Sequence, residues 1–182
     1  MGAMGRGNDE QRPTADIPAG DPMNGPDADE PPEHWRYARH LESLAAAPGP
    51  GAGPQAEAEV VAAVLRDPDG VMAESAVVTH LDRRAVQLLD EEEFPAWSRA
   101  MAAALAGRAF PERRLREWSL LKAVTRGEAW SPEELTAASD WCQRTAARLL
   151  TSYEALALLA TDARTRRVRN AAAERLRRGT AV

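Results

Sequence analysis

The sequence predicts an all-α protein whose helices follow a tail rich in acidic residues, proline and glycine. From Gln55 onward, apolar residues recur at steps of three and four, the spacing that places them on one face of a helix. Helix-start signals such as "SPEE" at 131–134, together with glycines at helix ends, divide this stretch into six or seven helices. No segment alternates apolar and polar residues between hairpin turns, so we expect almost no strand.

The chain is predicted to begin with a disordered acidic tail, residues 1–31. Large apolar side chains are scarce there, so the segment cannot bury enough surface to offset the entropy of ordering. Residues 32–47 predict a short helix, with Trp35, Leu41 and Leu44 available to dock on the body. "PGPGAGP", residues 48–54, is rich in turn-forming residues and predicts a linker. An all-helical domain is then expected over residues 55–179.

Three helices are predicted between residues 71 and 127. The first lies in "VMAESAVVTHLDRRAVQLL" and the second follows "EEE", where carboxylates favour a helix N-terminus. The third ends at Gly127, a residue suited to helix termination. The expected inward-facing residues are Val78, Leu81, Ala85, Leu88, Phe94, Trp97, Met101, Leu105, Leu115, Trp118 and Leu121.

The clearest helix start is Ser131, predicted as an N-cap with Glu134 as its capping-box partner. Trp130, just before this cap, is expected to pack on Leu135 as a hydrophobic staple; the alternative is an exposed anchor for a partner. A second capping box, "TSYE" from Thr151, predicts a short apolar helix, and Thr165 is the expected cap of the last one. One continuous helix is expected after Ser131, with an inward stripe of Leu135, Ala138, Cys142, Ala146 and Leu149.

The segment "YEALALLATDARTRRVRNAAAERL" places an aspartate, a Val-Arg pair, small residues and a leucine after a short apolar helix. It resembles the HEAT and HEAT-like repeat family, over about one repeat, and the chain is similar to actinobacterial proteins with such repeats. The resemblance implies a right-handed α-α superhelix of three or four helical hairpins, with the aspartate and arginine hydrogen-bonded within and between repeats. The matching residues are Asp162, Val168, Arg169, Ala172 and Leu176.

Charge is distributed unevenly: the chain has a net charge of −5, yet residues 163–182 hold seven arginines and one glutamate. An acidic body argues against a protein that coats nucleic acid generally, because such a protein needs a broad positive field. Local binding of phosphate or of an acidic partner stays open. The arginines expected to face outward and to contact such a partner are Arg166, Arg167, Arg177 and Arg178.

Two other roles for these arginines are also open. In the structural interpretation, Arg169 caps or ladders the repeat, while Arg175, Arg177 and Arg178 interact favourably with the C-terminal dipole of their helix. Alternatively, the basic end of the chain binds the acidic tail in cis, a contact that salt would weaken.

Catalytic and metal-binding signals are weak. His34 and His40 are six residues apart, which does not place them on one helical face as a zinc site requires. His80 is expected at the helix surface or partly buried, and Cys142 as a small buried hydrophobic residue. No phosphate loop, nucleophile elbow or metalloprotease motif occurs, so we expect no metal and no cofactor.

The same composition bears on location and function. The single cysteine suits a reducing compartment, and no apolar run reaches the length of a membrane span, so a cytoplasmic protein without membrane contact is expected. The predicted function is a non-enzymatic protein-protein interaction module, a scaffold or adaptor. The alternative is a nucleic-acid-associated regulator that uses the arginine-rich C-terminal helix. An enzyme would require a constellation of His80, Asp82 and Cys142.

Overall fold

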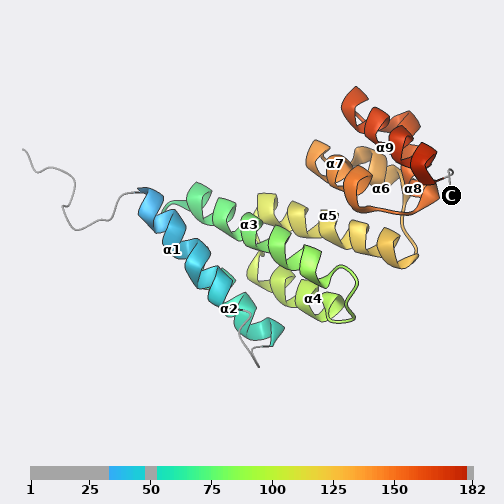
Figure 1. Cartoon of the computed structure of the whole chain (residues 1–182). Helices are drawn as coiled ribbons and strands as arrows, with labels where there is room; N and C mark the ends of the chain where they lie inside the picture. Colours follow the sequence, from blue (N-terminus) through green and yellow to red (C-terminus); the bar gives the residue numbers. More distant parts are fainter. Residues whose placement is uncertain (1–32, 48–52, 180–182) are drawn as a thin grey trace, which may run out of the picture. The chain divides into compact units, whose positions relative to one another are not determined.

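Figure 1 shows the computed structural model, which describes residues 33–47 and 53–179. Within these ranges all regular structure is α-helical and no strand occurs, which confirms the predicted all-α class. The predicted tail and linker residues 48–52 lie outside the described residues. The helices are α1 (Glu33–Ala46), α2 (Pro54–Val64), α3 (Gly70–Leu88), α4 (Phe94–Ala104), α5 (Ala109–Arg126), α6 (Pro132–Ala137), α7 (Asp140–Leu149), α8 (Tyr153–Asp162) and α9 (Arg166–Gly179).

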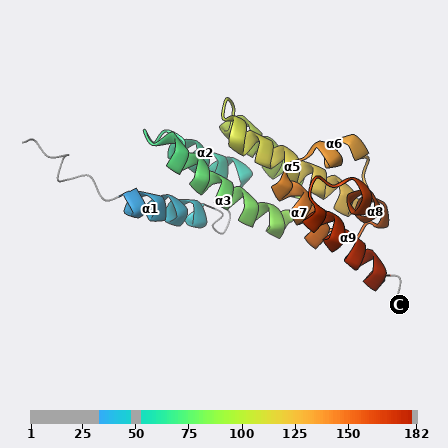
Figure 2. The same cartoon turned by 90° about the horizontal axis from the view of Figure 1, so that it is seen from above.

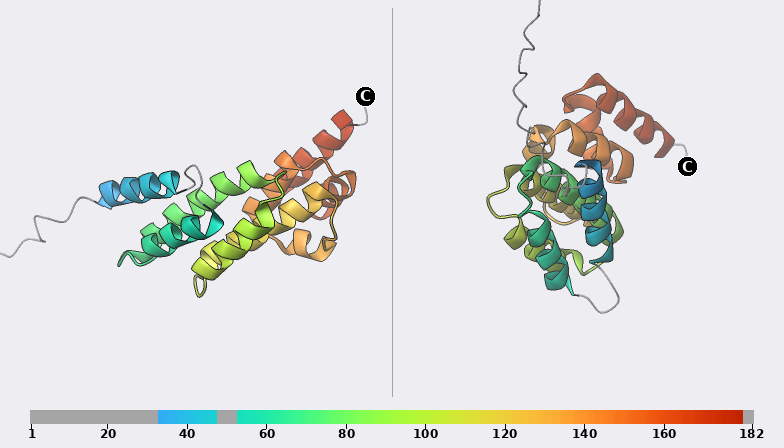
Figure 3. Two further views of the ribbon diagram at one scale, coloured as in Figure 1. Left: turned by 90° about the horizontal axis from the view of Figure 1, so that it is seen from below. Right: turned by 90° about the vertical axis from the view of Figure 1, so that its left-hand side faces the viewer.

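Helices that are two apart in the sequence pack against each other. α1 contacts α3, α3 contacts α5, α5 contacts α7 and α7 contacts α9, while α2 contacts α4 and α6 contacts α8. Figures 1 and 2 show α3 lying between α1 and α5. In Figure 3 the helices α6 to α9, coloured orange to red, gather beside α5. α5 therefore joins the first helices of the body to the last ones.

The turn from α5 to α6 follows the predicted signals. Gly127 ends α5 with a φ of +67°, a left-handed conformation that glycine adopts at little cost. Ser131 caps α6, because its Oγ accepts a hydrogen bond from the backbone N–H of Glu134 at 3.2 Å. The side chain that engages the cap is Glu133 rather than the predicted Glu134: its carboxylate accepts the Ser131 hydroxyl at 2.8 Å.

The prediction of one continuous helix after Ser131 is wrong, because α6 and α7 are separated at Ala138, whose backbone is extended with a ψ of 162°. Ser139 then caps α7 by accepting the Cys142 N–H at 3.2 Å. The N–H of Ser139 itself binds the Glu117 carboxylate of α5 at 3.0 Å. This break gives eight helices, rather than six or seven, in the described residues from 53 onward.

Of the other predicted helix starts, two shift by one residue and one is confirmed. Ser152, not Thr151, caps α8 by accepting the Ala155 N–H at 3.3 Å. Thr165 caps α9 as predicted, at 3.3 Å from the N–H of Val168. α2 begins at Pro54, the last residue of the predicted linker, since proline suits the first turn of a helix.

Docking of α1 differs in part from the prediction. Leu44 is fully buried and Leu41 is partly buried against the core, but Trp35 is 62% exposed, so the expectation that it docks on the body is wrong. Polar contacts add to the apolar ones: His40 Nε2 lies 2.9 Å from Asp67 Oδ2, and the Tyr37 hydroxyl lies 3.3 Å from that of Thr79.

Every inward-facing residue predicted for α3, α4 and α5 is buried. A buried carboxylate, which periodicity does not reveal, lies among these helices. Glu57 of α2 accepts hydrogen bonds from His80 Nε2 at 2.8 Å, from Trp97 Nε1 at 3.0 Å and from Arg84 Nε at 3.2 Å. His80 is therefore buried, not at the surface, because its ring completes this network.

Burial raises the pKa of Glu57, but the hydrogen bonds from His80, Trp97 and Arg84 and the charge of Arg84 outweigh that effect. The pKa of Glu57 is thus lowered from its ordinary value of 4.5, and the carboxylate is the favoured form in the folded chain.

Removing this carboxylate is expected to destabilise the fold. Glu57→Ala should lower the free energy of unfolding in urea by about 3 kcal/mol, because it leaves the buried donors of His80 and Trp97 without an acceptor. Glu59→Ala, an exposed position on the same helix, should change it by less than about 0.5 kcal/mol. Equal effects at the two positions would contradict a structural role for the Glu57 network.

The lowered pKa of Glu57 also predicts a pH dependence. A carboxyl with a lower pKa in the folded state stabilises it above the unfolded pKa, and this contribution is lost as pH falls through the folded value. The difference in unfolding free energy between wild type and Glu57→Gln should therefore shrink as pH falls below about 4.5. A difference that stays constant from about pH 6 to about pH 3 would count against the lowered pKa.

Candidate partner-binding site

α7 and α9 enclose a groove of about 580 Å³ whose walls are dominated by arginine. We call it the arginine groove. α7 contributes two arginines and α9 three, against a single carboxylate, so the groove is strongly positive in a chain that is acidic as a whole. Its charged residues are Arg144, Arg148, Arg167, Arg175, Arg178 and Glu174.

The helical repeat explains why these residues meet. On α7, Cys142 and Ala146 face the core, which leaves Arg144 and Arg148, one turn apart, exposed. On α9, Arg167 and Arg178 are eleven residues apart, close to three full turns, so they share one face of the helix. Contact between α7 and α9 brings the two faces together.

Arg175 fixes the groove rather than offering a free charge. Its guanidinium donates to the backbone carbonyl oxygens of Ala147, at 3.3 Å, and of Arg148. These carbonyls belong to the last turn of α7, which has no intrahelical donor for them. Arg175 therefore caps α7 from α9 and holds the two walls at a defined spacing.

Three of the groove arginines are available to a ligand. Arg144, Arg148 and Arg167 are exposed, and none of their guanidinium groups has an ion-pair partner within the described part of the chain. Arg178 is paired with Glu174 at 3.1 Å. A hydrogen bond from Arg177 and the charges of Arg177 and Arg178 hold the pKa of Glu174 below its usual value, so this acid is already satisfied.

Of the four arginines predicted from the sequence to contact a partner, two line this groove and two do not. Arg167 and Arg178 line the arginine groove, whereas Arg166 and Arg177 are exposed on α9 outside its lining. Arg144 and Arg148 also line the groove, but they were not among the arginines predicted from the sequence. Their signal in the sequence is an i, i+4 pair opposite the apolar stripe of their helix, but only the packing of α7 on α9 shows that it matters.

Most residues that match the repeat pattern pack in the core or close a helix end. Val168 and Ala172 are buried, and Leu176 is partly buried against the core. Arg169 donates to the carbonyl oxygen of Ala163 at 2.6 Å and so closes the end of α8. Asp162 is exposed, and its carboxylate accepts the hydroxyl of Thr161 at 2.8 Å.

Trp141, at the start of α7, is among the residues that line the arginine groove. The Arg114 guanidinium of α5 lies over its ring, 3.5 Å from the centroid, and Trp118 meets the ring edge-on at 5.3 Å. Arg114 also lies 2.5 Å from Asp82 Oδ2 of α3. One face of the Trp141 ring is therefore covered, which leaves little room for a stacked nucleobase.

The residues that an enzyme would require have separate partners. His80 binds Glu57, whereas Asp82 binds Arg114 and Trp118. Burial raises the pKa of the Cys142 thiol to about 12, with Glu117 adding to the effect, so the thiol stays protonated at neutral pH and is a poor nucleophile. In the described ranges, no three His, Cys, Asp or Glu side chains gather as metal ligands. Among the described helices, none has both the length and the apolar character of a membrane span.

A scan of protein-family models finds no match for this chain, and comparisons with curated proteins and with solved structures find none either. What the site binds has to follow from its own geometry and charge.

The contact of Arg114 with Trp141 is expected to stabilise the site. Arg114→Ala should lower the free energy of unfolding by about 2–3 kcal/mol, since it leaves Asp82 without its cation and exposes the Trp141 ring. Arg116→Ala is the matched control on the same helix, because that side chain is 70% exposed and its one ion pair within the described residues is with Glu112, at 3.8 Å. The control should lose less than about 1 kcal/mol. Urea unfolding of both variants measures the difference, and similar losses would refute a special role for Arg114.

Proposed function

We propose that this chain is a non-enzymatic protein-interaction module that binds an acidic segment of a partner protein in the arginine groove. The observation that carries the proposal is the set of three exposed arginines without ion-pair partners among the described residues, facing one groove from two helices. Guanidinium groups bind carboxylates through paired, charge-assisted hydrogen bonds, so aspartate and glutamate side chains are the ligands that suit this lining.

A HEAT-like, right-handed stack of helical hairpins is part of the same proposal. The packing of helices two apart, from α1 to α9, supports it, and so does the burial of Val168 and Ala172 at the matching positions of α9. In such stacks the exposed side chains of successive helices form the binding surface, so specificity resides in residues such as Arg144 and Arg167 rather than in the fold.

Nucleic acid is the second candidate ligand, because arginines also bind phosphate. Two observations favour an acidic protein segment instead. Residues 33–162 hold twenty acidic and fourteen basic side chains, so a long phosphate backbone would meet repulsion beyond the basic last helix. Trp141, the aromatic residue of the groove, already has one face covered by Arg114. A short acidic segment needs neither a broad positive field nor a stacking surface.

Binding of labelled probes tests this function by fluorescence anisotropy. The probes are an acidic decapeptide of alternating glutamate and glycine, and single-stranded and duplex DNA, each at low and near-physiological salt. The variant Arg144→Gln, Arg148→Gln and Arg167→Gln should weaken peptide binding about tenfold, because three exposed ion pairs contribute roughly 1–2 kcal/mol together. Salt should weaken the wild-type complex.

The matched control is Arg66→Gln, Arg99→Gln and Arg126→Gln, which removes the same charge from exposed positions outside the groove. It should bind the acidic peptide as the wild type does. Tighter binding of DNA than of peptide, lost in the groove variant, would replace the proposal with the nucleic-acid alternative. Absence of peptide binding at low salt, or an equal loss in both variants, would overturn it.

A further inference from the structure

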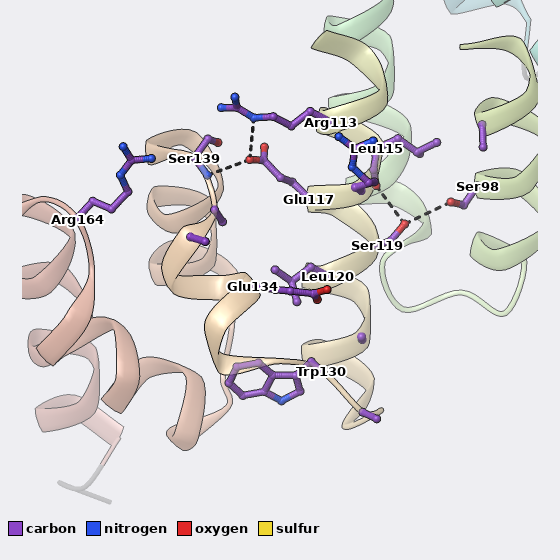
Figure 4. Close-up of a pocket in the computed structure, with 16 residues that line it drawn as sticks. Ser98, Arg113, Leu115, Glu117, Ser119, Leu120, Trp130, Glu134, Ser139 and Arg164 are labelled. Carbon is purple, nitrogen blue, oxygen red and sulfur yellow. Dashed lines mark hydrogen bonds and ion pairs between the residues drawn. The ribbon is translucent and has the colours of Figure 1, made fainter. Parts of the chain in front are cut away.

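A second cavity, of about 730 Å³, lies along α5 (Figure 4). We call it the α5 groove. Leu115 and Leu120 line it from α5, Trp130 from the turn that follows, and alanines of α4, α5 and α6 complete its apolar lining. Eight of its sixteen lining residues are apolar and the other eight are serines or charged residues. Its size falls in the range of cavities that hold ligands.

The two ends of the α5 groove differ in chemistry. In Figure 4, Trp130 lies at one end, near Leu120 and Glu134, and Arg113 and Arg164 lie at the other. Trp130 is half-buried and packed against the core, and its indole N–H has no hydrogen-bond partner among the described residues. The groove thus offers an apolar surface with a free donor at one end and cations at the other.

The carboxylate at the basic end is already engaged. Glu117 is buried, accepts the N–H of Ser139 at 3.0 Å and lies 3.5 Å from Arg113 Nε and 3.9 Å from Arg114 Nε. Glu117 is therefore not available as an ion-pair partner for Arg164. The exposed guanidinium of Arg164 has no ion-pair partner in the described segments. One cation of this end remains for a ligand.

The α5 wall gives the scale of the groove. Arg113 and Leu120 are seven residues apart on α5, and a helix rises 1.5 Å per residue, so the wall between these two positions is about 10 Å long. An extended peptide covers that distance in about three residues. Ser98 and Ser119 also line the groove: the Ser119 hydroxyl donates to the carbonyl oxygen of Leu115 at 3.1 Å and lies 3.3 Å from the Ser98 hydroxyl, so the oxygen of Ser98 can accept a hydrogen bond from a peptide N–H.

We propose that the α5 groove binds a short extended segment of a partner protein, with an apolar side chain against Trp130 and Leu120 and an acidic residue at Arg164. The match of the carboxylate to the unpaired cation, and of the apolar anchor to the Trp130 end, gives the segment a direction as well as a composition. This site is independent of the arginine groove, which selects for charge alone.

Selection from a phage-displayed library of random dodecapeptides on the full chain tests this proposal. Enriched peptides should carry a large apolar residue and an aspartate or glutamate at one fixed spacing. Synthetic copies, measured by calorimetry, should lose about tenfold in affinity for Trp130→Ala and about fivefold for Arg164→Gln. Tyr153→Ala and Arg66→Gln, exposed positions outside the groove, are the aromatic and charge controls and should bind as wild type.

Three results would overturn the proposal: no enrichment of that pattern, equal binding of the enriched peptides to Arg164→Gln and wild type, or their displacement by the acidic glutamate–glycine decapeptide, which would place them in the arginine groove. Arg164→Gln keeps the test valid if Trp130→Ala does not fold, because Arg164 is exposed. Failure here leaves the arginine groove untouched, since that site is measured with a different probe and different variants.

Discussion

The rest of the structure depends on the contacts that the guanidinium of Arg114 makes with neighbouring helices. It lies 2.5 Å from Asp82 of α3 and covers the ring of Trp141 in α7, so one side chain of α5 joins three helices. Asp82 accepts a second hydrogen bond, from the indole of Trp118, which fixes the ring that meets Trp141 edge-on. Both grooves have a wall on α5 or α7, and their geometry therefore follows from how Arg114 holds those two helices.

Other buried polar side chains also join helices, because they form hydrogen bonds to groups on neighbouring helices. Gln143 donates to the carbonyl oxygens of Leu135 and Thr136, left free where α6 ends, and its own oxygen accepts the N–H of Arg164. Lys122 donates to the carbonyl oxygen of Leu88 at the end of α3. Helix ends in this chain are thus satisfied by side chains from neighbouring helices, which ties the position of each helix to the next.

The features that could be predicted from the sequence depend on residues close together in the chain. The features that were missed depend on residues far apart in it. Apolar spacing placed Leu81 and Trp97 correctly in the core because a helical face is a property of adjacent turns. The break at Ala138 was missed because it is stabilised by Glu117, twenty-two residues before Ser139. His80 was misplaced for the same reason: its partner Glu57 lies on another helix, and no periodicity links the two.

The candidate site shows the same division. A run of arginines in the sequence marks the basic end of the chain, but helical geometry sends Arg167 toward α7 and leaves Arg166 outside the groove. Arg148 becomes part of the candidate site only because α9 packs against α7, the helix that carries it. The result is a local positive groove beside a stretch of the chain, residues 33–162, that holds twenty acidic and fourteen basic side chains. An acidic segment is therefore attracted more strongly to the groove than to that stretch, which orients the segment before it makes contact.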